Sequence, residues 1–377
     1  MSGRRDKKNS NASTMPLQQT IQYNCDISDA RDNGIYSICV LVLRLRNLYK
    51  WEKGIAPWIE PDPPVLLDWI AAKEEYWLDI LGQDFQDLSI GDQVADPFNL
   101  LPVNNFLEDR SLVYGAGYGR SMKAIFFLAE KIEEKTVDGC PAVILGREMA
   151  RDLASPFALL QEGIIYLRKE PFRYFLWDQI HDIRPTGKDA MQSALSHYGL
   201  LKQSGNLDRA MLIERLDHVV EEEMTPFLYH ELGEMHEDFL DSNTMKKIAG
   251  AFPDSAVEFL VRAVKDVLAD TNEKGMLGHI IAAEKIASQG FYMSFLDGLR
   301  RLLSPEIVKA YGEFLAGGDW QVLEEARTAC RKGNMARAEK LLVVAERLNR
   351  ETPEQIAPWI EQELLAPLGL ELPQSLR

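Results

Sequence analysis

Cysteine is scarce in this chain of 377 residues, which has only four. Cys25, Cys39, Cys140 and Cys330 are far apart and form no C-x-x-C pair, so the sequence indicates no disulfide framework. Scattered cysteines are typical of buried thiols in a reducing compartment. We therefore predict a cytoplasmic protein whose cysteines are buried and reduced.

Basic residues are also in deficit. The 42 Lys and Arg residues stand against 58 Asp and Glu residues, a net charge of −16. Such a chain repels phosphate backbones and anionic headgroups, so we expect no nucleic-acid or membrane partner. The longest apolar run, residues 38–43, is too short to span a bilayer. The basic start MSGRRDKKNSNAST has no apolar core, so it resembles no signal peptide; we predict a disordered tail over residues 1–16, with Met15 as an alternative start.

The sequence also has no long stretch of the apolar–polar alternation that is typical of β-strands, and the fold is predicted to be mainly α (α+β). Apolar spacing predicts helices over about 35–54 and 65–81. Short apolar runs at 112–114, 124–132 and 142–145 predict a small antiparallel sheet with a tight turn at Asp138-Gly139, although 122–135 also fits a helix. Helical spacing returns at Pro156 and continues to Ile183.

A proline–glycine segment at residues 184–188 is the best domain boundary. It separates an α+β domain at 17–187 from an all-helical domain at 188–377. In the second domain, Thr225-Pro226, Ser304-Pro305 and Thr352-Pro353 each predict a helix start. Small residues from Ala326 to Ala345 are spaced as in a tetratricopeptide-like helical hairpin with its turn near Gly333.

The hexapeptide IAPWIE occurs twice, at residues 55–60 and 356–361. We favour the interpretation that each copy is a proline-started turn with a tryptophan packed in a core. The alternative is a duplicated docking peptide, in which Trp58 and Trp359 bind a partner protein. Trp51, Trp69 and Trp77 gather with Trp58 in the N-terminal region, where a core is the first expectation and a partner interface the second.

Histidine is rare, yet four of the six histidines lie between residues 218 and 279 among many glutamates. Facing helices that carry such side chains can hold iron, manganese or zinc. Glu214 and His218 share one helix face, and His230 and Glu234 share another, each opposite an apolar seam. Neither Glu-x-x-His pairs nor H-E-x-x-H occur here. A solvated face is therefore favoured, and a divalent-metal site at Glu214, His218, His230 and Glu234 is the alternative; no cofactor is otherwise predicted.

One glycine-rich segment, GAGYGRS, spans residues 115–121. Gly115, Gly117, Gly119 and Arg120 could cradle a phosphate, but the segment matches neither G-x-G-x-x-G nor the P-loop pattern. A strained hairpin with glycines at positive φ is the simpler explanation.

The stretch LRLRNLYKWEKG at residues 43–54, and the chain onward to about Trp77, resembles a bacterial protein family of unknown function. This resemblance implies a bacterial cytosolic origin and brings no activity, cofactor or site residues. Our leading hypothesis is a non-catalytic interaction or regulatory protein with a protein partner, a homo-oligomer being possible. A metal-dependent enzyme and a phosphate or nucleotide binder are the alternatives.

Overall fold

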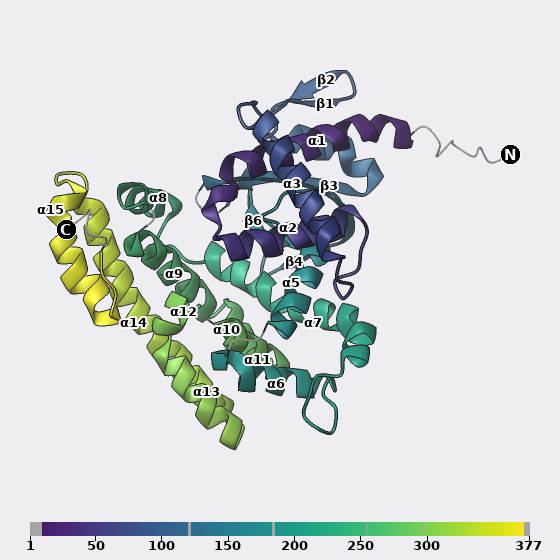
Figure 1. Ribbon diagram of the computed structural model, residues 1–377. Coiled ribbons are helices and arrows are strands. Elements are labelled where there is room, and N and C mark those ends of the chain that lie inside the picture. Colours follow the sequence, from purple (N-terminus) through teal and green to yellow (C-terminus); the bar gives the residue numbers. More distant parts are fainter. Residues whose placement is uncertain (1–9, 120–121, 183–184, 254, 297, 373–377) are drawn as a thin grey trace. The chain divides into compact units, whose positions relative to one another are not determined.

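The computed structural model describes residues 10–119, 122–182, 185–253, 255–296 and 298–372 (Figure 1). The chain divides between Asp178 and Gln179 into two compact units, here called the N-terminal and C-terminal domains. The boundary expected from the sequence lies at residues 187 and 188. Pro185–Gly187 forms a single 3-10 turn there, and Arg184 falls outside the described residues.

The N-terminal domain combines helices with a five-stranded sheet and a small hairpin. Its helices are α1 (Ser10–Asp32), α2 (Ile38–Glu52), α3 (Pro63–Ile80), α4 (Leu100–Leu107) and most of α5 (Lys169–His181). Its strands are β1 (Leu88–Ile90), β2 (Gln93–Ala95), β3 (Leu112–Tyr118), β4 (Ala124–Val137), β5 (Cys140–Arg151), β6 (Ala158–Gln161) and β7 (Ile164–Arg168). Because α1 begins at Ser10, residues 10–16 of the predicted tail are helical, and residues 1–9 lie outside the described chain.

The main sheet has the order β3-β4-β5-β7-β6. As predicted, β3, β4 and β5 are antiparallel neighbours, and Asp138 and Gly139 join β4 to β5 with φ of 49° and 82°, the type I′ pattern. The helix predicted from Pro156 is wrong over its first part, where β6 and β7 form instead. Strand β7 pairs with β5 on one side, in parallel, and with β6 on the other, and its residues 165–168 are all buried. Burial on both faces removes the period-two alternation that marks a strand in sequence.

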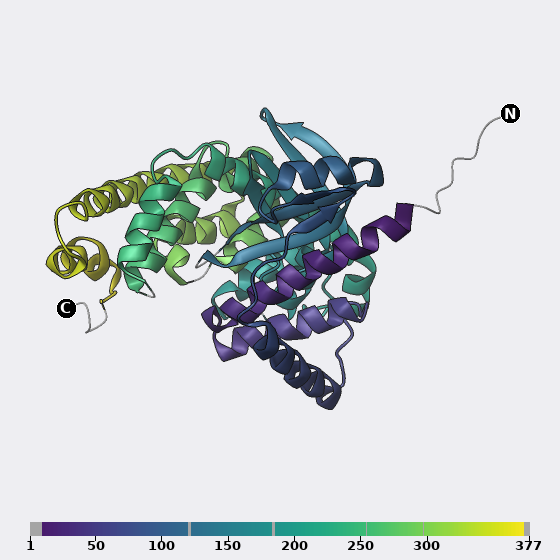
Figure 2. The same ribbon diagram turned by 90° about the horizontal axis from the view of Figure 1, so that it is seen from above.

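Helix α1 lies against the sheet, and α3 packs against α1 and α2 (Figure 2). Ile21 and Cys25 of α1 are fully buried with Phe126 and Leu128 of β4. Trp77 of α3 is also buried, in a cluster with residues of α1 and α2, as the core interpretation of the tryptophans predicted. Trp51 and Trp69 pack partly buried against the same cluster.

Buried ion pairs tie this domain together. Lys123 Nζ lies 2.9 Å from Asp29 Oδ1 and donates to Ser28 Oγ at 2.7 Å, with all three side chains buried. Arg168 Nε donates to Glu148 Oε1 at 2.6 Å, and both side chains are fully buried. Buried charges are tolerated only when they are paired in this way. We therefore read both pairs as structural.

The C-terminal domain is all-helical in its described residues. It contains α6 (Lys188–His197), α7 (Arg209–Met235), α8 (Ser242–Ala251), α9 (Ala256–Thr271), α10 (Met276–Ala282), α11 (Ile286–Phe295), α12 (Gly298–Leu302), α13 (Pro305–Gly317), α14 (Trp320–Arg347) and α15 (Pro353–Ile360). Helix α9 is central, because α7, α8, α10, α12 and α14 all pack against it. Eleven of its sixteen residues are buried, and the side that carries Phe259, Arg262 and Asp266 stays partly exposed.

Two of the three predicted proline starts are confirmed. Pro305 and Pro353 begin α13 and α15, with Ser304 and Thr352 as the N-caps. The start at Thr225-Pro226 is wrong, because α7 continues through a buried Pro226. A proline inside a helix removes one hydrogen bond. Here α7 buries apolar side chains both before and after it, so tertiary packing offsets that loss.

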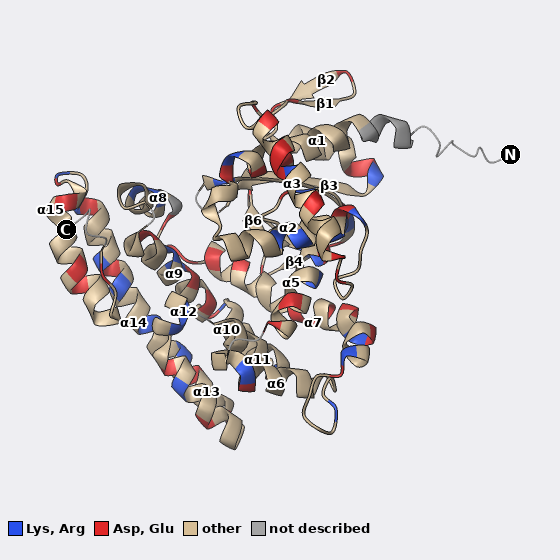
Figure 3. Ribbon diagram, viewed as in Figure 1, with Lys and Arg blue, Asp and Glu red and all other residues tan. Residues whose placement is uncertain are grey.

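The predicted hairpin near Gly333 is also wrong, since α14 is one helix of 28 residues. Asn334, which was expected in the turn, is fully buried, and its Nδ2 donates to the carbonyls of Leu303 and Cys330. Its amide therefore anchors α14 to the start of α13 and does not form a turn. Acidic and basic residues alternate along α14 (Figure 3), which is typical of a helix with a solvent-facing side.

Cys25, Cys140 and Cys330 are buried with no disulfide, as predicted, whereas Cys39 is exposed on α2. Among the described residues, no helix combines the length and apolarity needed to cross a membrane.

Candidate functional site

The four residues of the alternative metal site all lie on α7, but the helix separates them into two pairs. Glu214 and His218 are exposed, whereas His230 and Glu234 are half-buried. Twelve residues of helix place His218 about 18 Å from His230 along the axis. The structure therefore brings His230 and Glu234 together and leaves Glu214 and His218 apart from them.

Gly233 sets the distance between α7 and its neighbour α9. A Cβ added at Gly233 would lie 2.2 Å from the carbonyl oxygen of Ala269, so only glycine fits at this crossing. The close approach places the face of α7 that carries His230 against Asp266 and Asp270 of α9. Each pair, 230/234 and 266/270, is four residues apart and so occupies one helix face.

His230 is held between carboxylates on both sides of its ring. Its Nδ1 lies 2.7 Å from Asp270 Oδ1, and its Nε2 lies 3.7 Å from Glu234 Oε1. Lys265 Nζ donates to the other oxygen of Glu234 at 2.7 Å. One potential ligand atom from each of His230, Glu234 and Asp266 lies within 4.8 Å of the others. This is a compact set of one imidazole and two carboxylates.

Burial and charge shift the pKa values of this cluster. Burial by itself lowers the pKa of His230, but the facing Asp270 carboxylate raises it to about 10. Burial raises the pKa of Glu231 to about 7 and also raises that of Asp266. Burial of several carboxylates in this cluster therefore costs free energy. Carboxylates with pKa values raised by burial are common at functional sites and in structural ion-pair networks alike.

Sequence reasoning missed Asp266 and Asp270. Asp270 is 1% exposed and Asp266 is half-buried, and both lie on α9. The available signal was a pair of carboxylates four residues apart, on the polar side of a helix that also carries Glu258, Arg262 and Lys265. Buried carboxylates need a partner, and the opposing histidine was visible in the same sequence.

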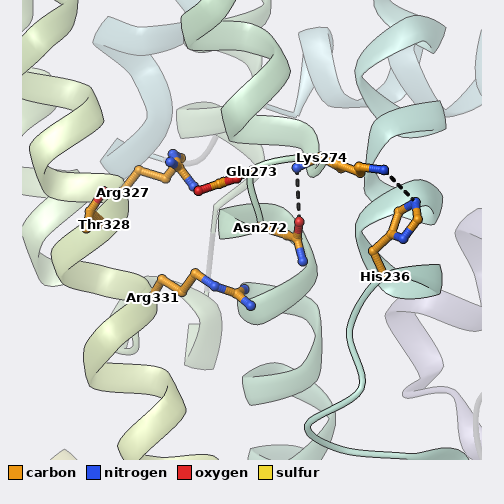
Figure 4. A pocket seen from close by; sticks show the side chains of 7 residues that line it. All are labelled: His236, Asn272, Glu273, Lys274, Arg327, Thr328 and Arg331. Carbon is orange, nitrogen blue, oxygen red and sulfur yellow. Dashed lines mark hydrogen bonds between the residues drawn. The ribbon is translucent and has the colours of Figure 1, made fainter. Parts of the chain in front are cut away.

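A pocket of about 400 Å³ opens nearby in the same domain (Figure 4). It is lined by His236 at the end of α7, by the α9–α10 connection and by α14 (residues His236, Asn272, Glu273, Lys274, Arg327, Thr328 and Arg331). Lys274 Nζ lies 3.5 Å from His236 Nε2.

The two arginines of this pocket already hold other groups. Arg327 donates to both oxygens of Glu324 and to the Thr271 carbonyl, and Arg331 donates to the Leu268 carbonyl at 2.8 Å and pairs with Glu237 at 2.8 Å. The last carbonyls of a helix have no partner within the helix, so these arginines cap α9. The pocket is therefore best explained as part of the packing interface between α14 and α9, which these two arginines hold together.

A second pocket, of about 440 Å³, includes His218 and lies between α6, α7 and the start of α11. Tyr198 OH donates to Glu223 Oε1 at 2.6 Å at its wall, and Glu223 is 3% exposed. Burial raises the pKa of Glu223 to about 7. His218 is exposed to solvent, as the favoured interpretation predicted, and it also lines this pocket.

The glycine-rich segment is not a loop over most of its length, because Gly115 and Gly117 lie within β3. None of Gly115, Gly117 and Gly119 has positive φ, so the strained-hairpin explanation is wrong. A Cβ at Gly115 would lie 2.1 Å from the Phe127 ring, and one at Gly117 would lie 2.7 Å from Gln161 Nε2. Packing against the Phe127 ring of β4 explains Gly115, whereas at Gly117 the flexible end of the Gln161 side chain on β6 can move aside. Phosphate binding stays untested, and its Arg120 lies outside the described residues.

The two IAPWIE copies have different backbones. Residues 55–60 follow α2 as an irregular turn, whereas residues 356–360 are helical within α15, which Thr352 starts with a capping box. Trp58 and Trp359 are both half-buried, under the guanidinium groups of Arg173 and Arg347 respectively. The copies do not present one common shape, and partner binding by these tryptophans stays a prediction.

Two family models match the chain, and both concern a family of unknown function (DUF6866). The model of its N-terminal domain matches residues 16–168, and the model of its C-terminal domain matches residues 173–363. The chain belongs to the DUF6866 family. The resemblance to a family of unknown function, noted over residues 43–77, therefore extends over most of the chain.

Membership of DUF6866 brings no activity or site residues with it. No curated protein matches the chain, and no solved structure matches it. What this DUF6866 member does must therefore be inferred from its own residues.

Proposed function

We propose that this DUF6866 protein is a non-catalytic interaction protein and that it self-associates through α3. The observation that supports the proposal is the distribution of exposed apolar side chains. Among the described residues, ten of the twenty large hydrophobic side chains that are exposed lie between residues 38 and 81. Exposed apolar surface concentrated in one region is characteristic of protein interfaces.

Helix α3 has two apolar faces. The inner face buries Ile70, Trp77 and Ile80 in the domain. The outer face carries Leu67, Ala71, Leu78 and Leu81, whose spacing of four, seven and three residues keeps them on one side of a helix. Leu67 is 62% exposed and Leu78 is 74% exposed. The outer face lies about a quarter turn around the helix from the buried face, so the apolar surface of α3 extends beyond the part that the domain covers.

The outer face of α3 is self-complementary. Its central positions are Ala71 and Glu74, with Leu67 and Leu78 at either end. In a two-fold, antiparallel pairing of two α3 helices, Leu67 would face Leu78 of the second copy, and Ala71 would face Glu74. Leucine then meets leucine, and the glutamates do not oppose each other. An isologous dimer requires this kind of matching within a single patch.

The proposal is tested by sedimentation velocity over a range of protein concentrations. We expect the wild type to form dimers and the double variant Leu67→Glu/Leu78→Glu to remain monomeric, because the two substituted positions face each other across the pairing and their like charges repel. Leu101→Glu is the matched control, since Leu101 is 67% exposed on α4, away from the patch. A wild type that stays monomeric throughout, or a control that dissociates equally, would refute self-association.

A further inference from the structure

We propose that His230, Glu234 and Asp266 form a binding site for a divalent first-row metal ion such as Zn²⁺ or Mn²⁺. The site lies in the C-terminal domain, on α7 and α9, and does not depend on the α3 surface. It keeps two residues of the metal site considered from the sequence, removes Glu214 and His218, and adds Asp266.

The three potential ligand atoms already converge. The separation of 3.7 Å between His230 Nε2 and Glu234 Oε1 compares with about 3.3 Å between ligands of a tetrahedral zinc ion with bonds near 2.0–2.1 Å. The whole set lies within 4.8 Å. Metal binding therefore needs small side-chain rotations and the release of the Nε2 proton that His230, with a pKa raised to about 10, carries at neutral pH. One imidazole and two carboxylates suit Zn²⁺ and Mn²⁺ better than a soft, thiolate-seeking ion.

Asp270 supplies the support that a metal-binding histidine usually has. Ligand histidines commonly direct their second nitrogen at a carboxylate, which fixes the ring and its tautomer. Asp270 Oδ1 meets His230 Nδ1 at 2.7 Å, so Nε2 is directed toward Glu234. The second oxygen, Asp270 Oδ2, is buried, and the Tyr292 side chain also interacts with this carboxyl group. A buried carboxylate that fixes the ring in this way is the support that a ligand histidine commonly has.

Lys265 does not block the site. It bonds Glu234 through Oε2, whereas Oε1 is the oxygen that faces His230. Glu234 can therefore bind a metal through Oε1 and keep its bond to Lys265. Three protein ligands leave at least one coordination position for water or for a ligand oxygen, as in catalytic zinc sites.

The test is a calorimetric titration of Zn²⁺, and separately of Mn²⁺, into chelator-treated protein that carries no histidine tag. We expect one site per chain in the wild type and a higher thermal transition with saturating metal. Asp266→Asn and Glu234→Gln each remove a charged ligand and should weaken binding at least tenfold. Asp270→Asn leaves the ligands in place but loosens His230, so a roughly ten- to hundredfold loss is expected.

His218→Asn and Glu214→Gln are the matched controls, because both residues are exposed on α7 and should leave the affinity unchanged. Circular dichroism of each variant separates lost binding from lost folding, and the conservative amide substitutions are chosen to keep the fold. Absence of stoichiometric binding by the wild type, or equal losses in the controls, would overturn the site. Neither result would bear on self-association through α3.

Discussion

At the scale of single residues, Glu223 shows most clearly how burial changes chemistry. Its carboxyl group is 3% exposed, accepts a hydrogen bond from Tyr198 and has a pKa raised by burial to about 7. The native state therefore holds a proton that the unfolded chain, with an ordinary glutamate pKa near 4.5, has already lost. Between these two values the free energy of unfolding must fall as pH rises.

The corresponding prediction concerns Glu223→Gln. Glutamine keeps an acceptor for Tyr198 but does not ionise, so the variant should gain stability relative to wild type as pH rises from about 4.5 to 7. The rise of the Glu223 pKa from 4.5 to about 7 corresponds to about 3 kcal/mol in the free energy of unfolding. Urea unfolding at several pH values measures it. Glu222→Gln, at an exposed neighbour, is the control; parallel curves for wild type and Glu223→Gln would show that the carboxyl titrates normally.

Other residues could be interpreted from sequence only in part. The hydroxyl–proline starts at Ser304 and Thr352 were correct because a helix cap depends on neighbours along the chain. Gly115 was misinterpreted, because the ring that excludes a Cβ there belongs to Phe127 of another strand. The sequence does not show which residues from other strands will lie beside a glycine.

At the scale of elements, the crossing of α7 and α9 determines the proposed metal site. Gly233 allows the two helices to touch, and the touching faces carry the histidine and the carboxylates. The separate helix faces were predictable from four-residue spacing. Their pairing was not, since nothing in the spacing says which helix a given face will meet.

This crossing makes a prediction about Gly233→Ala. Alanine normally stabilises a helix interior by up to about 1 kcal/mol relative to glycine. At Gly233 we expect the opposite sign, a loss of about 1–3 kcal/mol from overpacking against Ala269, together with weaker metal binding. Thermal unfolding and calorimetry measure both effects.

Gly312→Ala provides the matched control. Gly312 lies inside α13 with nothing within 4 Å of an added Cβ, so this variant should be neutral or more stable. If the two variants changed stability in the same direction, the close approach of α7 and α9 would not be the reason for glycine at 233.

At the scale of the whole molecule, each domain has a core of its own. Leu128 is fully buried in the sheet–helix core of the N-terminal domain, and Leu260 is fully buried in the helical core around α9. The family models also end and begin near the division at Asp178, at residues 168 and 173. Two cores of this size are each large enough to fold cooperatively.

We therefore expect Leu128→Ala and Leu260→Ala to act on different calorimetric transitions. Each truncation should cost about 2–5 kcal/mol in its own domain, because it leaves a cavity in a packed core. Differential scanning calorimetry of the full chain shows whether each variant shifts the transition of its own domain and leaves the other transition unchanged. One transition that both variants shift equally would show that the two domains unfold as a single unit.

The sequence by itself determined the class of this protein, because composition and periodicity are local properties. It predicted a mainly helical, acidic chain with α2, α3 and the antiparallel core of β3, β4 and β5 in the right places. Tertiary structure decided what local signals cannot contain: that α7 and α14 run unbroken, that β7 forms between two strands, and that His230 meets Asp266 and Asp270. The packing energy of residues that are distant in sequence outweighs the helix-breaking tendency of a single proline or glycine. Which of these residues pack together is visible only in the folded chain.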